Sequence, residues 1–502
     1  MRHVLVVSFG GQYAHLISRR IRDLGTYSEV IPYFKANKDR VLEADALILS
    51  GGPSSVYQEG APTIDPDLLG LRPTLGICYG FQLMAKLLGG EVARGRGEYG
   101  PTRVRVKDGP LFEGWDEEEV VWMSHSDYVS SPPPGFKVTA WSENGYVAAF
   151  QHESLPLYGV QFHPEVSHTR KGKTLLSNFL RIAGAPKNWS SEAMMRAVLE
   201  EAKRQVEGCR HILAAVSGGV DSTVAALVVK RIAKAPFTAV LVNHGLMRKK
   251  EPEQAVEMLK DLGIDVVYVD ASSEFLTALK GVRDCEEKRK VIGKKFIEVF
   301  ERTAKGLDFD CLVQGTLYPD VIESGAEPGA DRIKSHHNVA GLPENLKVKL
   351  VEPLKFLYKD EVRRLGLSLG LPREVVMRHP FPGPGLAVRI MGEVTPEKLE
   401  IVREASSIVE EELRRAGVYE EVWQAFAAVG DDRWVGVKGD ARVEGYVVTV
   451  RIVVSEDAMT ADWYRADHDL LDRIAGRIGS MEKVTMVTYA VTTKPPSTIE
   501  PC

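Results

Sequence analysis

Near the middle of the chain lies Ile212-Leu213-Ala214-Ala215-Val216-Ser217-Gly218-Gly219-Val220-Asp221-Ser222-Thr223, an apolar run that leads into a glycine-rich turn. The pattern predicts a strand, a tight turn and the start of a helix, a setting in which backbone N–H groups surround an anion. Glycine lets the backbone approach a phosphate closely, and Ser217 and Ser222 can add hydroxyl donors. The segment therefore predicts a phosphate site at the end of a strand.

This segment differs from the Walker loop of phosphoryl-transfer enzymes. It has no Gly-x-x-x-x-Gly-Lys-Ser/Thr pattern, and Asp221 stands where that loop carries a lysine. A carboxylate at this point suits a magnesium ion that is bound together with a phosphate chain. From the pattern alone, an ordinary strand–helix turn with serine capping remains the alternative.

Short apolar runs alternate with helical patterns on both sides of this turn, which predicts α/β architecture. Strands are predicted at 4–7, 46–49, 74–77, 157–160, 212–216, 239–242, 266–269 and 311–313. Helices are predicted at 12–24, 192–206, 222–233, 253–262, 288–305 and 360–369. A polar linker at 184–190 and the helix-breaking segment 379–385 interrupt the alternation.

Beyond residue 385 the pattern changes. Helices at 396–416 and 461–477 and strands at 446–454 and 484–492 predict an α+β arrangement. We therefore predict two doubly wound α/β domains, at 1–184 and 191–378, followed by a smaller α+β C-terminal domain at 379–502.

The composition is that of a globular protein: 502 residues suggest about three domains, and 44% are apolar and 26% charged. A net charge of −5 gives no indication of nucleic-acid binding. The apolar run at 1–7 is too short for a signal peptide or a membrane span, so we expect no membrane association. Cysteines 78, 209, 285, 311 and 502 lack paired spacing, which predicts neither disulfides nor a zinc site and suits a reducing cytoplasm.

A second chemical motif is Gly76-Ile77-Cys78-Tyr79-Gly80, which follows a predicted strand and precedes a helix. This is the pattern of a nucleophile elbow with cysteine as the nucleophile, and a helix N-terminus favours the thiolate. His163 and Glu165 supply a base and a group to orient it. The alternatives are a buried structural thiol at Cys78 and a metal site formed by His163, Glu165 and His168.

Together these features resemble the class I glutamine amidotransferases over residues 1–184. The resemblance implies that Cys78 attacks the glutamine side-chain amide, that His163 is the general base and then the acid, and that Glu165 orients His163. Ser50-Gly51-Gly52-Pro53 resembles the oxyanion loop of that family, with the N–H groups of Gly52 and Tyr79 as donors. Gln82, Ser126 and Asp127 match its glutamine pocket.

The segment Ser217–Thr223 resembles the pyrophosphate loop of the N-type ATP pyrophosphatases, which cleave ATP between the α- and β-phosphates. The resemblance implies an ATP site that uses Ser217, Gly218, Gly219, Val220, Asp221, Ser222 and Thr223. Asp221 is the implied Mg²⁺ ligand.

Further motifs occur at 314–324, 333–339, 379–385 and 494–500. Their order resembles the glutamine-hydrolysing GMP synthetase family over nearly the whole chain. The implied reaction uses glutamine, ATP and Mg²⁺ to aminate xanthosine 5′-monophosphate (XMP) through an adenylyl intermediate, giving GMP, AMP and pyrophosphate. The implied XMP contacts are Arg289, Gln424, Lys494, Ile499 and Glu500, and the C-terminal domain is the implied homodimer interface.

Three positions depart from that family. Asn243 replaces an aspartate, Ala340 replaces a glycine, and the ending Pro501-Cys502 replaces Trp-Glu after Glu500. Two other functions stay open from the residues alone: an ATP pyrophosphatase that acts on another acceptor such as tRNA, and a non-catalytic nucleotide-binding regulator. The absence of a basic excess argues against the first, and the intact motifs argue against the second.

Overall fold

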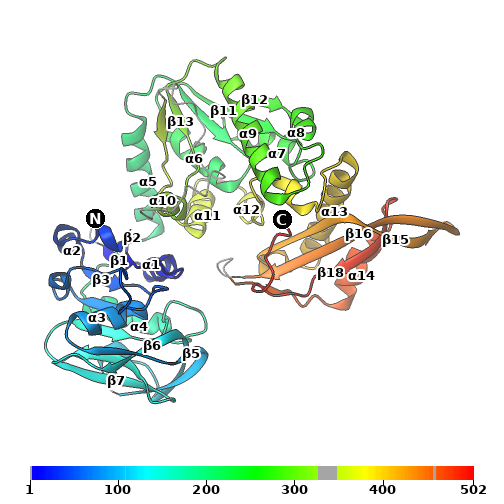
Figure 1. Ribbon diagram of the computed structural model, residues 1–502. Coiled ribbons are helices and arrows are strands. Elements are labelled where there is room, and N and C mark those ends of the chain that lie inside the picture. Colours follow the sequence, from blue (N-terminus) through cyan, green and yellow to red (C-terminus); the bar gives the residue numbers. More distant parts are fainter. Residues whose placement is uncertain (1–2, 108, 326–347, 456–459) are drawn as a thin grey trace. The chain divides into compact units, whose positions relative to one another are not determined.

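The computed structural model describes residues 3–107, 109–325, 348–455 and 460–502, which divide into two compact units, Met1–Met194 and Met195–Cys502 (Figure 1). The motif at 333–339 and Ala340 lie outside the described residues. Among the helices that are described, none has the length and apolar character to cross a membrane.

The first unit is built on one mixed sheet with the strand order β2-β1-β3-β4-β9-β8-β7-β5-β6. The strands are β1 (Val4–Ser8), β2 (Ser28–Pro32), β3 (Ala46–Leu49), β4 (Thr74–Ile77), β5 (Glu91–Val106), β6 (Glu118–Ser131), β7 (Phe136–Ser142), β8 (Val147–His152) and β9 (Leu157–Val160). The helices are α1 (Ala14–Asp23), α2 (Lys38–Glu43), α3 (Tyr79–Leu87) and α4 (Gly172–Ile182), with 3₁₀ turns η1 (Tyr33–Lys35), η2 (Pro66–Leu68) and η3 (Pro110–Phe112). α5 (Ser191–Val206) spans the boundary between the units.

Strands β2, β1, β3, β4 and β9 are parallel, and the other half of the sheet is antiparallel. Strands β3, β4 and β9 are buried along their whole length, and such strands appear in a sequence as continuous apolar runs. This is why the predicted strands at 4–7, 46–49, 74–77 and 157–160 are confirmed. In the long strands β5 and β6, polar and charged residues interrupt the apolar ones, so the apolar pattern missed them.

The second unit contains a parallel sheet with the order β12-β11-β10-β13-β14. Its strands are β10 (Ile212–Val216), β11 (Phe237–Asn243), β12 (Asp265–Asp270), β13 (Cys311–Val313) and β14 (Lys349–Val351). Its helices are α6 (Val220–Ile232), α7 (Glu251–Asp261), α8 (Ser272–Ala278), α9 (Cys285–Ala304), α10 (Tyr318–Gly325), α11 (Lys359–Ser368) and α12 (Arg373–Val376). β10 lies in the middle of this sheet, with β11 on one side and β13 on the other. The strand order reverses at β10, so its carboxyl end is the switch point at which such sheets bind ligands.

The C-terminal part adds a second sheet, in which β16 pairs with β15, β17 and β18. Its elements are η4 (Gly385–Arg389), α13 (Pro396–Arg415), η5 (Tyr419–Glu421), β15 (Gln424–Lys438), β16 (Ala441–Val454), β17 (Asp462–Trp463), α14 (His468–Gly479) and β18 (Val484–Tyr489). The α/β class is confirmed. The helix predicted at 461–477 begins too early, because Asp462–Trp463 pairs with β16 and the Asp467 side chain caps the helix that starts at His468.

One hydrophobic core joins the two sheets of the second unit. Leu213 and Phe275 of the parallel-sheet region belong to the same buried cluster as Val402 of α13 and Val448 of β16. The boundary that we predict at 378/379 therefore crosses a continuous core.

The prediction that no disulfide forms is wrong. Cys209 pairs with Cys311, with the Cα atoms 5.9 Å apart, and Cys285 pairs with Cys502, with the Cα atoms 5.4 Å apart. The partners are separated by 102 and 217 residues, so only the folded chain brings them together. Cys78 is a free, buried thiol.

Candidate active sites

Cys78 lies at a sharp turn between β4 and α3 and has the backbone angles φ 53° and ψ −106°. A positive φ is unusual for a residue with a side chain, and strain of this kind is typical of nucleophile elbows. The flanking glycines are needed because space is short. A Cβ on Gly76 would lie 2.7 Å from the Gly80 carbonyl oxygen, and a Cβ on Gly80 would lie 2.3 Å from that of Leu49.

His163 and Glu165 follow β9, next to the elbow. His163 Nδ1 lies 2.7 Å from Glu165 Oε1, and both side chains are buried. Burial alone would lower the pKa of His163, but the negative charges of Glu165 and Cys78 raise it well above its usual value. For the alternative of a metal site with His168, the described residues contain no metal-binding cluster, and the His168 ring packs on Trp122.

The loop Ser50–Pro53 lies against the elbow. The Gly80 N–H donates to the Ser50 carbonyl oxygen at 3.0 Å. A Cβ on Gly51 would lie 3.2 Å from His163 Cε1 and 3.7 Å from Cys78 Cβ, and one on Gly52 would lie 3.2 Å from Tyr79 Cγ. The structure thus brings the predicted oxyanion loop, the cysteine and the histidine together.

The predicted glutamine-pocket residues lie on α3 and β6. Gln82 is buried, and its Nε2 donates to the Asp127 carbonyl oxygen at 2.7 Å and to Gln161 Oε1 at 3.1 Å. Asp127 Oδ1 accepts from the Tyr57 hydroxyl at 2.8 Å. Gln82 thereby ties the elbow helix to β6, whereas Ser126 on the same strand is exposed.

The glycine-rich segment of the second unit has the predicted strand–turn–helix form. It follows β10, contains Gly218 at φ +78°, and leads into α6. The Ser222 hydroxyl bridges the loop, because it accepts from the Ser217 N–H at 3.2 Å and donates to the Gly219 carbonyl oxygen at 3.2 Å. Thr223 Oγ1 donates to the same carbonyl at 2.8 Å.

Lys359 is a residue at this loop that the sequence pattern does not reveal. It begins α11, 138 residues from the loop, and its Nζ lies 2.5 Å from Asp221 Oδ2. The other carboxylate oxygen, Asp221 Oδ1, is buried with no hydrogen-bond partner among the described residues. The backbone after β13 also presses on this turn, since a Cβ on Gly315 would lie 2.8 Å from the Ser222 nitrogen.

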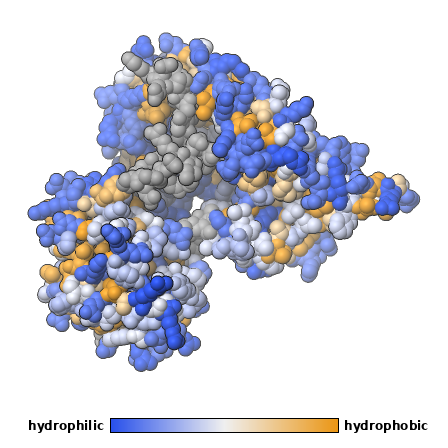
Figure 2. Space-filling model, in the orientation of Figure 1, coloured by the Kyte–Doolittle hydropathy of each residue, from blue (hydrophilic) through white to orange (hydrophobic). Residues whose placement is uncertain are grey.

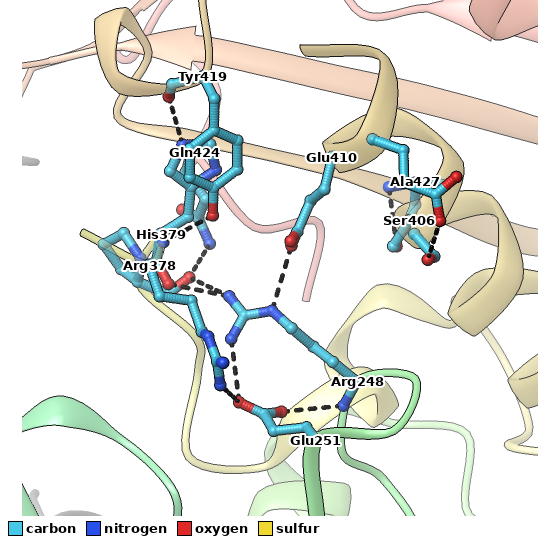
Figure 3. Close-up of polar contacts among 12 residues, drawn as sticks. Arg248, Glu251, Arg378, His379, Ser406, Glu410, Tyr419, Gln424 and Ala427 are labelled. Atoms are coloured by element: carbon cyan, nitrogen blue, oxygen red, sulfur yellow. Dashed lines mark hydrogen bonds and ion pairs between the residues drawn. The ribbon is translucent and has the colours of Figure 1, made fainter. Parts of the chain in front are cut away.

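A cavity of about 700 Å³ lies beside Gly218, between α7, α12 and α13. Arg248 organises one wall (Figure 3). Its guanidinium lies 3.3 Å from Glu251 and 3.2 Å from Glu410, and it donates to the His379 carbonyl oxygen at 2.8 Å. Arg248 therefore ties the loop after β11 to α13 and to the segment 379–385. His379 itself is buried, which lowers its pKa to about 4, and its Nε2 donates to the Tyr419 carbonyl oxygen.

Several residues predicted to bind the nucleotide meet at the C-terminal tail. Gln424 Nε2 donates to Glu500 Oε1 at 2.5 Å. Arg289 Nη2 donates to the Cys502 carbonyl oxygen at 2.7 Å. Ile499 is half-buried beside Glu500, while the backbone of Lys494 pairs with Ala461. Arg389, which the sequence does not single out, holds the Glu500 carboxylate through two bonds of 3.1 and 3.0 Å.

The departure at Asn243 has a structural explanation. Its Oδ1 accepts from the Gly245 N–H at 2.9 Å and its Nδ2 donates to the Tyr268 hydroxyl at 2.9 Å. An amide supplies the acceptor that an aspartate would supply to this turn, and it adds a donor.

Comparison with known proteins gives matches along the chain. The family model for class-I glutamine amidotransferase matches residues 5–183, that for NAD synthase matches 193–302, and that for the GMP synthase C-terminal domain matches 411–501. A glutamine-hydrolyzing GMP synthase from Pyrobaculum aerophilum is 58% identical, with both chains covered completely.

Relatives of the same name from Symbiobacterium thermophilum and Carboxydothermus hydrogenoformans are 54% and 52% identical. Each alignment covers 99% of this chain, and 98% and 99% of the respective relative. The chain therefore belongs to the family of glutamine-hydrolyzing GMP synthases.

Proposed function

We propose that this chain converts XMP to GMP with ammonia taken from glutamine, at two active sites that lie in separate units. The observation that carries the proposal is the buried Cys78–His163–Glu165 arrangement in a chain that also contains the phosphate loop Ser217–Thr223. Full-length similarity to glutamine-hydrolyzing GMP synthases supports the assignment of the substrates.

At the first site, the Cys78 sulfur attacks the carbonyl carbon of the glutamine side-chain amide. His163 accepts the thiol proton and donates it to the departing ammonia, and Glu165 keeps the imidazole oriented. The N–H groups of Gly52 and Tyr79 donate to the oxyanion that forms on the amide oxygen. Gln82, Ser126 and Asp127 shape the glutamine pocket, and water then hydrolyses the thioester to glutamate.

At the second site, O2 of XMP attacks the α-phosphorus of ATP and pyrophosphate leaves. Ammonia then attacks C2, AMP leaves, and GMP forms. The loop residues Ser217, Gly218, Gly219, Val220, Asp221, Ser222 and Thr223 hold the phosphate chain of ATP. Lys359 provides the positive charge that the Walker loop carries within its own sequence.

The loop suits Mg²⁺, because Asp221 Oδ1 is a buried oxygen without a hydrogen-bond partner among the described residues. Mg²⁺ is commonly held by one or two carboxylates together with substrate phosphates, and it would neutralise charge on the pyrophosphate. Asp221 would hold the ion, with Lys359 as its neighbour.

XMP binds where the tail meets the C-terminal sheet. Glu500 and Gln424 are already in contact, and Arg289, Lys494 and Ile499 lie on the same tail or next to it. Cations such as Arg289 and Lys494 suit the phosphate dianion.

We also propose the three-part division into 1–184, 191–378 and 379–502, in which the last two parts share one hydrophobic core and the last part is the interface of a homodimer. The hairpin of β15 and β16 supports this interface because it exposes Trp434, Val435 and Val437, and Figure 2 shows hydrophobic residues near its tip. Glutamine, ATP and XMP are metabolites of the cytoplasm, and we place the reaction there.

Cys78→Ala tests whether the first site serves only to release ammonia from glutamine. We expect it to abolish GMP formation with glutamine and to leave the rate with ammonium chloride within about twofold of wild type, because free ammonia bypasses the thioester. The rates are measured by the absorbance change on XMP amination. Equal loss of both activities would overturn the division of labour.

Glu165→Gln tests the electrostatics of the first site. Glu165 is the largest single influence that raises the pKa of His163, so removing its charge should lower that pKa, as followed by NMR of the imidazole protons. We expect the glutaminase rate to fall roughly hundredfold or more, with the ammonia-dependent rate retained. An unchanged pKa of His163 would contradict the proposed role of Glu165.

Lys359→Ala tests the role of the remote lysine. We expect the ammonia-dependent kcat/KM for ATP to fall roughly hundredfold, since a charge at the phosphate chain is lost. Lys355→Ala is the matched control, because Lys355 is similarly exposed but pairs with Glu201 instead of the loop. Similar losses in both variants would refute the specific role.

Val437→Lys tests the dimer interface. Val437 is 74% exposed, so we expect folding to be preserved and the dimer to dissociate in sedimentation velocity at low micromolar concentration. Val120→Lys, at a 40% exposed valine of β6, should remain dimeric. A wild-type protein that sediments as a monomer would refute the proposal.

A further inference from the structure

The last residues of the chain are joined to α9 by a covalent bond and by a hydrogen bond. Cys502 forms the disulfide with Cys285, the first residue of that helix. One turn further along α9, Arg289 donates to the Cys502 carbonyl oxygen. Cys502 is thus held through both its side chain and its backbone.

Glu500, two residues earlier, is held by Arg389. The Arg389 side chain is 1% exposed and binds the carboxylate in a two-bond arrangement. The guanidinium carbon lies 4.3 Å from the ring centre of Phe426 and 5.0 Å from that of Phe381, so the cation is fixed by its surroundings before any ligand arrives. Arg389 Nη1 is buried and has no hydrogen-bond partner among the described residues.

Helix α9 also supports Arg389. Lys288 is completely buried, and its Nζ donates to the Ile390 carbonyl oxygen at 2.5 Å and to that of Ala387 at 3.4 Å. These carbonyls flank Arg389 in the sequence. The same helix therefore fixes both the cation that binds Glu500 and the end of the tail that carries Glu500.

We propose that the Cys285–Cys502 disulfide and the Arg389–Glu500 ion pair form a clamp that presets the C-terminal tail for the nucleotide, with Arg389 as a positioning residue. The inference rests on the proposed function only in taking Glu500 as a contact of XMP. A tail that is ordered before binding need not lose its freedom on binding, so affinity rises without any new contact. In this chain the disulfide supplies a covalent constraint two residues beyond Glu500.

A dithiol such as dithiothreitol opens the clamp. It transfers two electrons to the S–S bond, Cys285 and Cys502 become thiols, and the reagent leaves as its cyclic disulfide. Oxidation by a small-molecule disulfide reverses the step. The clamp therefore makes nucleotide affinity sensitive to the thiol–disulfide state.

The test measures the KM for XMP with ammonia as nitrogen donor, so that the state of Cys78 does not affect the rate. Cys502→Ser and Cys285→Ser should each raise the KM for XMP by about tenfold with kcat within twofold, the size expected when a few side chains must be ordered on binding. Cys209→Ser, which breaks the other disulfide, is the matched control and should leave the KM for XMP unchanged.

Treatment of wild type with dithiothreitol, checked by intact mass and thiol count, should give the same KM as Cys502→Ser. Hydrogen exchange of residues 492–502, without substrates, should increase in both. Equal KM values and equal exchange in the oxidised and reduced proteins would overturn the clamp. Absence of GMP formation by the oxidised wild type would instead refute the proposed function, and the exchange measurement would still test the clamp.

Arg389→Lys tests the positioning residue, because it keeps the charge and loses the two-bond geometry. We expect a rise of about tenfold in the KM for XMP and an unchanged KM for ATP. Arg389→Gln should have a larger effect on the KM for XMP. A matching rise in the KM for ATP, or a KM for XMP equal to that of wild type, would refute this role.

Discussion

Both candidate active sites depend on one steric constraint: a parallel strand must turn into a helix within a few residues while another backbone segment presses on the turn. At the elbow, Gly80 meets the Leu49 carbonyl so closely that a Cβ would be 2.3 Å away. At the phosphate loop, Gly315 approaches the first turn of α6 in the same manner. Close approach leaves backbone N–H groups pointing toward a shared space, which is what an oxyanion or a phosphate requires.

The two sites differ in how deeply their charged side chains are buried. His163 and Glu165 are buried with Cys78, so their mutual attraction is little screened and outweighs the penalty of burial on the imidazolium. At the loop, Asp221 and Lys359 are partly exposed and lie on elements far apart in the chain. Partial exposure suits the proposed ATP site, which would have to admit and release a highly charged phosphate chain, whereas the amide of glutamine, the substrate proposed for the first site, is neutral.

The strand–turn–helix geometry around the candidate site residues could be predicted from the sequence. Around Cys78 and at Ser217–Thr223, a glycine-containing turn directly follows an apolar strand. This local pattern is visible in the sequence. Lys359 and Arg389 could not be found in this way, because one lysine or arginine resembles any other until the fold places it against Asp221 or Glu500. The disulfides were missed for the same reason, and β5 and β6 were missed because polar and charged residues interrupt their apolar runs.

The shared core of the second unit has a consequence for how such a chain can be divided between genes. A break near residue 194 would fall between two units that each retain their own interior. A break near residue 378 would separate Leu213 and Phe275 from Val402 and Val448, so each fragment would present to water the apolar surface that the other now covers. The first unit can therefore be encoded as a separate subunit. The parallel-sheet region of the second unit must be encoded in one chain with the C-terminal sheet.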